Sequence, residues 1–224
     1  FVISTDTPLL LALSTALMLM IGVLQNRLDP VRGMFICGLA VGIGFLAKYA
    51  ALYFLAGIVL WATWDRFITA HNVITVRHLL LFCLGMMIAA SPNIIWNLTN
   101  DFTTVRHLGD NANIAKQSFD FAKTGRFLLG QLGVVGPVTF ILMLGILRPP
   151  FHSSLKRLMI CLSLPILALM TIQAFISDAN ANWTVASYPA LIVWLACWIA
   201  QTNRWRWGLL ASGINGAIAI VIIS

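Results

Sequence analysis

Charged residues are scarce in this sequence, and glutamate is absent altogether. Charged side chains make up 9% of the 224 residues, whereas a soluble domain usually carries about 25%. Hydrophobic residues account for 60% of the chain, and the mean hydropathy is +0.91. A chain this apolar cannot cover a water-facing surface. The composition therefore excludes an ordinary soluble domain and indicates an integral membrane protein with several spans.

The motifs of several common enzyme and metal sites are also missing. The chain has no P-loop, no GxSxG nucleophile motif and no zinc-protease motif. The four cysteines form no CxxC pair and have no histidine at metal-ligand spacing, so we expect small core residues: they are Cys37, Cys83, Cys161 and Cys197. The net charge of +7 is not taken as nucleic-acid affinity, because in membrane proteins an excess of Lys and Arg marks cytoplasmic loops.

Apolar runs of about 20 residues, the length that spans a bilayer, fill most of the chain. The pattern predicts an all-α, polytopic transmembrane bundle of about eight helices. The expected spans are residues 7–24, two helices within 34–64, then 79–95, 127–147, 158–176, 188–201 and 208–224. Gly42 and Gly44 lie in an apolar helix and are interpreted as helix-packing positions. No internal repeat is visible, and we expect one transmembrane domain over residues 1–224.

The run 34–64 is divided at Lys48 on two grounds. As one helix it would be roughly 46 Å long, well beyond a hydrocarbon core of about 30 Å. The division also produces a clear charge asymmetry, with nine basic residues on one side and five on the other. The nine are Arg27, Arg32, Arg66, Arg77, Arg148, Lys156, Arg157, Arg204 and Arg206; the five are Lys48, Arg106, Lys116, Lys123 and Arg126. The positive-inside rule then predicts that Asp6 and Lys48 share the extracytoplasmic side.

The segment 96–126 is predicted to be a long extracytoplasmic loop. It is polar, with aromatic residues and basic residues spaced along it, a composition compatible with an interfacial amphipathic helix.

Most of the unusual polar residues gather on this predicted outer side. Basic groups there suit the phosphate of an anionic lipid, and an aspartate suits a divalent cation that bridges to phosphate. The candidate donor phosphate and sugar-binding residues are Asp6, Lys48, Tyr49, Asn97, Asp101, Arg106, His107, Asn182 and Trp183.

Each candidate has a plainer alternative that the sequence leaves open. Asp6 precedes Pro8 at the start of a span and can simply cap that helix. Lys48 can extend its amine to the interface without any ligand, Arg106 and His107 can be solvated loop residues, and Trp183 can belong to an interfacial aromatic belt.

Seven short stretches, in order, resemble one family. They are residues 4–10 (STDTPLL), 38–49 (GLAVGIGFLAKY), 91–97 (SPNIIWN), 100–102 (NDF), 130–132 (GQL), 182–183 (NW) and 188–189 (YP). Together they resemble the bacterial family 39 membrane glycosyltransferases. This group is similar to protein O-mannosyltransferases, the aminoarabinose transferase that modifies lipid A and lipopolysaccharide galacturonosyltransferases.

The resemblance implies the GT-C fold and an inverting transfer of sugar from a polyprenyl-phosphate donor. The acceptor would be a lipid A, polysaccharide or protein of the cell envelope, reached on the outer side of the bacterial cytoplasmic (inner) membrane. Asp6 matches the family's second acidic position, which implies that it holds the donor phosphate or a divalent cation (Mg²⁺, Mn²⁺ or Zn²⁺), and Lys48 matches the family's lysine. The catalytic base belongs to a first outer loop, which we expect upstream of Phe1 together with an N-terminal helix.

Two other classes of protein remain as alternatives. One is a transporter or flippase of a lipid-linked precursor, which would favour broken helices and polar groups near the middle of the membrane, often with repeat symmetry. The other is a non-catalytic membrane assembly subunit.

Overall fold

The fold is built from helices because a chain inside a bilayer must satisfy its own backbone hydrogen bonds, and a helix does so within one segment. The computed structural model describes residues 4–68, 74–104 and 119–223, and every regular element in these ranges is helical. The α-helices are α1 (Asp6–Leu24), α2 (Pro30–Ala47), α3 (Leu52–Ile68), α4 (Val76–Thr99), α6 (Phe121–Val135), α7 (Pro137–Met143), α8 (Ser154–Ile176), α9 (Tyr188–Thr202) and α10 (Trp205–Ile223). Three short 3-10 helices join them: η1 (Tyr49–Ala51), η2 (Leu144–Leu147) and η3 (Ala181–Ser187).

The number of helices able to cross a membrane is close to the expectation. Within the described ranges, six are long and apolar enough, or seven if the bent pair of α6 with α7 and η2 forms one span. The six are α1, α2, α3 with η1, α4, α8, and α9 with η3. The all-α polytopic class is confirmed. The predicted total of about eight differs slightly from this count, which covers the described residues alone, and α10 lies where the last span was predicted.

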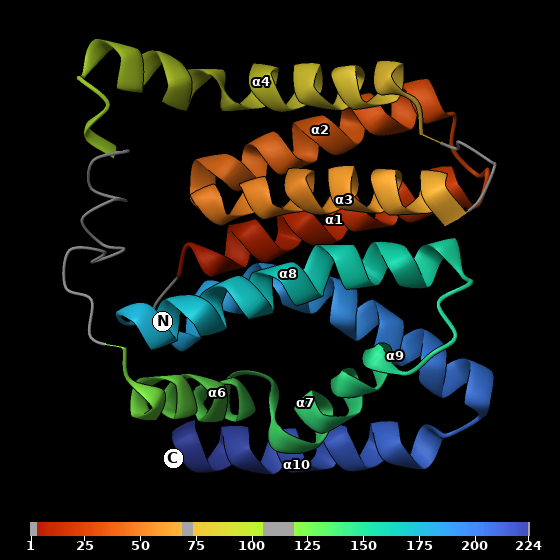
Figure 1. The fold of residues 1–224 in the computed structure, drawn as a ribbon, viewed down its shortest axis with the longest axis vertical. Helices are drawn as coiled ribbons and strands as arrows, with labels where there is room; N and C mark the ends of the chain where they lie inside the picture. Colours follow the sequence, from red (N-terminus) through yellow and green to blue (C-terminus); the bar gives the residue numbers. More distant parts are fainter. Residues whose placement is uncertain (1–3, 69–73, 105–118, 224) are drawn as a thin grey trace.

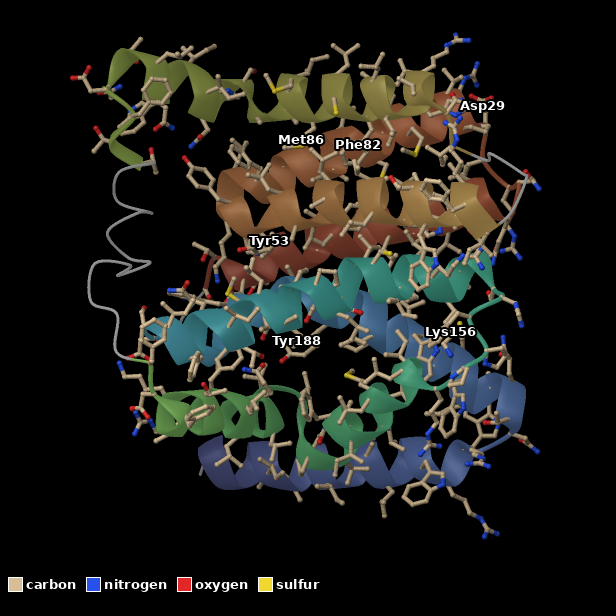
Figure 2. The ribbon with its side chains drawn as sticks, in the orientation of Figure 1. Asp29, Tyr53, Phe82, Met86, Lys156 and Tyr188 are labelled. Atoms are coloured by element: carbon tan, nitrogen blue, oxygen red, sulfur yellow. The ribbon has the colours of Figure 1, made fainter. Side chains whose placement is uncertain are left out.

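The helices lie side by side in a layered bundle with two distinct ends (Figure 1). Helix α2 packs against α1 and α4, α3 packs against α8, and α8 packs against α9. We call the end where α1, α3 and α6 begin and α2, α4 and α8 finish the Asp6 end. The opposite end, where α8 and α10 begin, is the Arg157 end. Asp29 and Lys156 lie there (Figure 2).

The division of the run 34–64 at Lys48 is confirmed. Helix α2 stops at Ala47, and Lys48 has an extended backbone (φ −160°, ψ 133°) before η1 begins. The Lys48 amide still donates to the carbonyl of Gly44, at 3.0 Å. Two shorter helices thus replace one overlong helix, and the lysine sits at the Asp6 end instead of inside the bundle.

Close contact between α2 and α4 depends on glycine. A Cβ on Gly38 would lie 2.0 Å from the carbonyl oxygen of Phe82, and one on Gly42 would lie 2.5 Å from that of Met86. From the other side, a Cβ on Gly85 would lie 2.3 Å from the carbonyl oxygen of Phe35. The two backbones approach too closely for side chains, as in small-residue packing of membrane helices. The packing role predicted for Gly42 is confirmed, and Gly44 also packs closely, since its Cβ would lie 3.1 Å from that of Ala12.

The predicted straight span 127–147 is wrong in shape. The helix starts earlier, at Phe121, and α6 and α7 meet at an angle of 105°. Gly136 has φ +85° at the break, a conformation that favours glycine, and Pro137 begins α7 without needing an amide donor. The Asn215 side-chain amide of α10 donates to the carbonyl of Val135 at 2.9 Å and to the Thr139 hydroxyl at 3.0 Å. A polar side chain thus replaces the helical bonding that the bend removes.

The predicted loop 96–126 is shorter than expected at both edges. Helix α4 continues to Thr99, and α6 already begins at Phe121. Residues 105–118 lie outside the described residues, so the interfacial helix remains a prediction.

Candidate functional site

An ion pair between Asp6 and Lys48 marks the Asp6 end of the bundle. The Lys48 amine lies 2.7 Å from Oδ1 of Asp6, and the exposed fractions of the two side chains are 25% and 17%. The pair joins the first residue of α1 to the residue that ends α2. The predicted co-location of the two residues at one end is confirmed, and they are in direct contact.

The second oxygen of the Asp6 carboxylate accepts hydrogen bonds from two other residues. Asn182, in η3, donates its side-chain amide to Oδ2 at 3.2 Å, and the Ser4 hydroxyl donates to the same atom at 3.1 Å. The Asp6 side chain therefore makes tertiary contacts and does not act as the cap of α1. Thr5 is the N-cap residue, without a side-chain capping bond, and the amide of Asp6 donates to the Ser4 hydroxyl at 3.2 Å.

A second cluster of polar side chains joins η1 to α4. The hydroxyl of Tyr49 donates to Oδ1 of Asn93 at 3.0 Å, and the amide of Asn97 lies 3.3 Å from the Tyr49 hydroxyl. The hydroxyl of Thr104 donates to Oδ1 of Asn97 at 2.7 Å. Asn97 is 4% exposed, and buried amides normally need such partners. Because Tyr49 follows Lys48 directly, this cluster adjoins the ion pair.

A third cluster of polar side chains, fully buried, holds η3 in place through Gln131 of α6. Gln131 of α6 is completely buried and donates to the carbonyl of Ala181 at 3.3 Å. Its Oε1 accepts from the hydroxyl of Thr184 at 2.7 Å and from that of Tyr188. These bonds tie α6 to η3 and to the start of α9. Since η3 also carries Asn182, the Gln131 cluster determines where the amide that contacts Asp6 lies.

The remaining predicted residues are not part of these clusters. Asp101 is exposed, in a turn after α4 with φ +50°. Trp183 is half-buried and packs against the apolar core. Arg106 and His107 lie outside the described residues. Their proposed contacts with a donor stay predictions.

Sequence reasoning missed several members of the clusters as site residues. Asn93 precedes Asn97 by one helical turn, so its position on the same face was available from the spacing. Gln131 is a polar side chain within a predicted span, which is itself a signal of a buried partner. No pattern in the sequence indicates the hydrogen bond from Ser4 to Asp6.

A divalent cation at Asp6 does not fit the residues that the structure describes. Among residues 4–68, 74–104 and 119–223, no group of three or more His, Cys, Asp or Glu side chains could hold a metal. Mg²⁺ and Ca²⁺ take six or more oxygen ligands, whereas Asp6 offers one carboxylate, already in contact with an ammonium.

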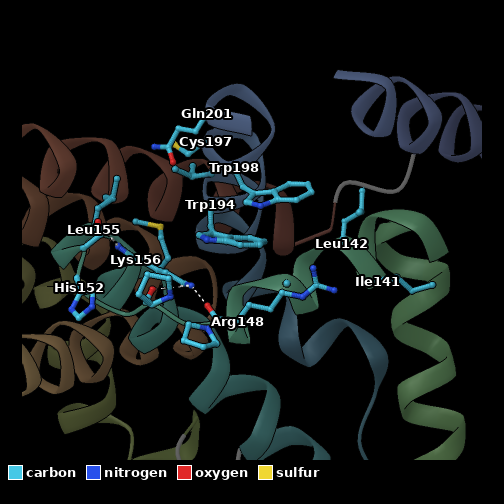
Figure 3. Close-up of a pocket in the computed structure, with 16 residues that line it drawn as sticks. Ile141, Leu142, Arg148, His152, Leu155, Lys156, Trp194, Cys197, Trp198 and Gln201 are labelled. Atoms are coloured by element: carbon cyan, nitrogen blue, oxygen red, sulfur yellow. Dashed lines mark hydrogen bonds between the residues drawn. The ribbon is translucent and has the colours of Figure 1, made fainter. Parts of the chain in front are cut away.

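The Arg157 end contains a cavity of about 650 Å³ between η2, α8 and α9 (Figure 3). Its lining combines apolar residues and two tryptophans with Arg148, His152 and Lys156. The cavity is therefore at the opposite end of the bundle from the ion pair, and it does not belong to the candidate site.

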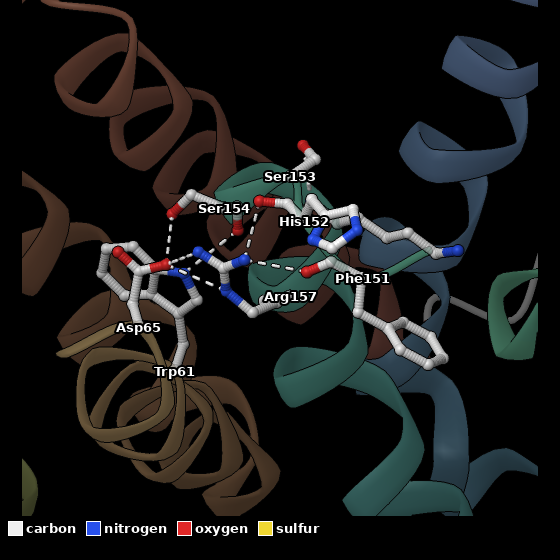
Figure 4. Close-up of polar contacts among 8 residues, drawn as sticks. Trp61, Asp65, Phe151, His152, Ser153, Ser154 and Arg157 are labelled. Atoms are coloured by element: carbon white, nitrogen blue, oxygen red, sulfur yellow. Dashed lines mark hydrogen bonds and ion pairs between the residues drawn. The ribbon is translucent and has the colours of Figure 1, made fainter. Parts of the chain in front are cut away.

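A second ion pair, between Asp65 of α3 and Arg157 of α8, is buried at the same end (Figure 4). Nε of Arg157 lies 3.0 Å from Oδ1 of Asp65, and Ser154 donates to that oxygen at 2.8 Å. Arg157 also donates to the carbonyls of Phe151 and His152, each at 2.8 Å. The predicted span 158–176 left Arg157 outside the helix. The structure corrects this, because α8 begins at Ser154 and the guanidinium is completely buried.

Comparisons with known proteins agree with the resemblance expected from the sequence. A family model described as dolichyl-phosphate-mannose-protein mannosyltransferase matches residues 1–96, a range that includes Asp6, Lys48, Tyr49 and Asn93. The chain is also 34% identical over 222 residues to the lipid A galacturonosyltransferase RgtD of Rhizobium johnstonii. This match covers 97% of the chain and 45% of that relative, so the chain spans about half the relative's length. No solved structure matches the chain.

Proposed function

We propose that this chain is part of an integral membrane glycosyltransferase. The enzyme moves a sugar from a polyprenyl-phosphate donor to a cell-envelope acceptor on the outer side of the cytoplasmic membrane. The observation that carries the proposal is the Asp6–Lys48 pair at one end of a membrane bundle, with Asn182 fixing the carboxylate. The resemblance to membrane glycosyltransferases supports the reaction class.

The role of Lys48 follows from the hydrogen bonds that an ammonium can make. A lysine has three N–H donors, and one of them is directed to Oδ1 of Asp6. Within the described ranges the other two have no partner and can bind phosphate oxygens, and the side chain is exposed enough to be reached. Asp6 acts as a positioning residue because it holds the ammonium at a fixed point at the Asp6 end. A pre-positioned cation stabilises negative charge that develops on a leaving phosphate.

The proposed reaction is a displacement at the anomeric carbon of the donor. The acceptor hydroxyl oxygen forms the new C–O bond while the bond to the phosphate oxygen breaks, and the polyprenyl phosphate leaves with the electron pair. The hydroxyl proton goes to a carboxylate base. Neither oxygen of Asp6 is suited to that task, because Lys48, Asn182 and Ser4 already bond to them. The base is expected in the first outer loop that the family resemblance implies, and a divalent cation stays a prediction that requires ligands besides Asp6.

The acceptor is proposed to be a lipid A-type glycolipid. The basis is the name of the relative, a lipid A galacturonosyltransferase. Tyr49, Asn97 and Asn182 would contact the sugar or phosphate of the donor, as would Asp101, Arg106, His107 and Trp183. The outward direction of the Asp6 end rests on the excess of basic residues at the other end.

The bend between α6 and α7 is the observation that favours a transporter, since transporters use broken helices. The bond from Asn215 to the Val135 carbonyl stabilises this break from within the protein. In contrast to the midplane sites of transporters, the polar clusters around Asp6 and Tyr49 lie at one end of the bundle. We therefore keep the transferase as the lead proposal.

The test is consumption of polyprenyl-phosphate sugars by the purified full-length gene product and by its Asp6→Asn variant. The proposal predicts turnover by the parent and a loss of at least about tenfold in the variant, because a charged hydrogen bond contributes about 1.5–3 kcal/mol. Asp120→Asn is the matched control. Asp120 is a carboxylate of the same end that caps α6 through the amide of Ala122, and asparagine caps equally well.

The outcomes separate the candidate functions. Equal turnover by the parent and Asp6→Asn would remove Asp6 from the site but keep the enzyme class. Absence of turnover with folded protein and every donor tried would contradict the transferase, and movement of the donor across vesicles would then favour the flippase.

A further inference from the structure

The cavity at the Arg157 end differs from the proposed sugar-transfer site in position and in chemistry. Its apolar lining includes Leu142, Met159 and Val193, and Trp194 forms one wall. Trp194 stacks on Trp198, with ring centroids 6.2 Å apart. These side chains would suit the first methylene groups of an acyl chain and the glycerol region of a lipid.

The rim of the cavity is basic. Arg148 reaches toward the space beside Trp194 and Leu142 (Figure 3). It is exposed, and its side chain makes no hydrogen bond or ion pair with the residues that the structure describes. The Lys156 amine donates to the carbonyls of Arg148 and Pro150 and so fixes the backbone of the segment that carries Arg148. Arg204 adds a further cation, 5.3 Å from the ring centre of Trp198.

Among the residues that the structure describes, no acidic side chain lines the cavity to neutralise this charge. The nearby carboxylate of Asp65 is engaged by the buried guanidinium of Arg157. An anion at the rim would thus meet cations without a competing carboxylate, and anions are attracted by such arrangements.

The cavity also lies at the end of the bundle, where we expect the membrane interface. It is bounded by the last turn of η2, the first turn of α8 and the last turns of α9. The exposed Trp205 and Trp207 begin α10 at the same end, and tryptophan favours the interface between lipid and water. Ile141, on the lining, is 64% exposed, which leaves an apolar side open toward lipid.

We propose that this cavity binds the phosphate diester headgroup of an anionic phospholipid from the leaflet at the Arg157 end. Arg148 is the main contact with the phosphate, and Trp194 with Trp198 packs against the glycerol and the first part of an acyl chain. Basic pockets between membrane helices are known to suit such headgroups. The inference is independent of sugar transfer, because it concerns the other end of the bundle.

The test titrates phosphatidylglycerol or phosphatidylcholine into the purified protein in detergent and counts bound lipids by native mass spectrometry. We expect one retained phosphatidylglycerol and affinity for phosphatidylcholine at least about fivefold weaker, the factor that corresponds to one basic residue at a membrane surface. Arg148→Gln should lower the affinity for phosphatidylglycerol by about the same factor, whereas Arg148→Lys should retain it. The matched control is Arg27→Gln, since Arg27 is an equally exposed basic residue of the same end that does not line the cavity.

Three results would overturn the inference. Equal retention of phosphatidylglycerol and phosphatidylcholine would mean that the cavity binds acyl chains without discriminating between headgroup charges. Equal losses of affinity for phosphatidylglycerol in Arg148→Gln and Arg27→Gln would mean that the overall positive charge of this end, and not Arg148 in particular, attracts the lipid. Displacement of the lipid by millimolar inorganic phosphate would identify a site for a free anion.

Discussion

At Asp6, the two carboxylate oxygens are divided between different parts of the chain. Oδ1 receives Lys48 from the end of α2, and Oδ2 receives Asn182 from η3. One short side chain thus connects three segments that are far apart in the sequence. The Asn182 bond restrains the carboxylate, so its loss should act on the reaction through the position of Lys48.

Asn182→Ala should lower kcat/KM for sugar transfer by about tenfold, because it removes one hydrogen bond to a charged group, about 1.4 kcal/mol. Asn180→Ala provides the control, since Asn180 is two residues earlier and, within the described part of the chain, bonds only through its backbone carbonyl, to the amide of Trp183. Steady-state kinetics on the full-length gene product would measure both. Similar losses in the two variants would show that the loop, not the amide, matters.

The buried ion pair between Asp65 and Arg157 should affect the stability of the protein. Breaking a buried ion pair leaves an uncompensated charge and costs about 3–5 kcal/mol, whereas replacing both partners by apolar residues is often neutral. Asp65→Leu and Arg157→Met should each lower the thermal unfolding midpoint in detergent clearly, and the double variant Asp65→Leu/Arg157→Met should lose less than the sum of the two single losses. Asp29→Asn, at an exposed helix cap, is the control and should change little. An additive double variant would contradict this account.

At the scale of elements, the α2–α4 contact shows how small residues determine helix packing. The backbone of α4 occupies the space where a side chain on Gly38 would be, 2.0 Å from a Cβ. Any side chain there must separate the helices. Since Lys48 ends α2 and Asn97 lies in the last turn of α4, such a separation would also disturb the bonds of Tyr49.

Gly38→Ala should destabilise the protein by about 1–3 kcal/mol, the usual cost of overpacking. Gly133→Ala is the matched control, because nothing lies within 4 Å of a Cβ at Gly133 in α6, and alanine is the better helix former by about 1 kcal/mol. Thermal unfolding in detergent compares the two. A Gly38→Ala variant as stable as the parent would mean that α2 and α4 are not in backbone contact.

The elements also show which parts of the fold were predictable. The division at Lys48 followed from length and charge, because an overlong apolar run with a central lysine is costly in a membrane. The bend at Gly136 was missed, although a Gly-Pro pair marks it, because Asn215, which stabilises it, comes from the last helix. In the site, Asp6 and Lys48 could be assigned to one end from topology. Their contact and the Gln131 cluster depend on tertiary packing of η3, which local patterns do not encode.

At the scale of the whole molecule, charge separates the two ends of the bundle. Among the described residues, the Arg157 end holds nine basic residues: Arg27, Arg32, Arg66, Arg77, Arg148, Lys156, Arg157, Arg204 and Arg206. The described acidic residues are divided: Asp29 and Asp65 lie at this end, and Asp6, Asp101, Asp120 and Asp178 lie at the other. By the positive-inside rule, the Arg157 end should face the cytoplasm.

This orientation predicts the accessibility of single cysteines in a chain whose four native cysteines are replaced by alanine. A membrane-impermeant thiol reagent added to intact cells should label Asp178→Cys and leave Arg27→Cys unlabelled until the cells are opened. Both positions are exposed, so exposure alone does not explain a difference. The reverse labelling pattern would indicate the opposite orientation in the membrane, with the Asp6–Lys48 ion pair on the cytoplasmic side.

In the proposed enzyme, Lys48, held by Asp6, recognises a lipid phosphate at the Asp6 end. The most direct test of this role is the binding of polyprenyl phosphate and of the uncharged polyprenol to the full-length protein and to its Lys48→Gln variant. We expect Lys48→Gln to bind polyprenyl phosphate about tenfold or more weakly, since a hydrogen bond to a charged group contributes about 1.5–3 kcal/mol. Its affinity for polyprenol should equal that of the parent. Unchanged affinity for polyprenyl phosphate in the folded variant would contradict the claim.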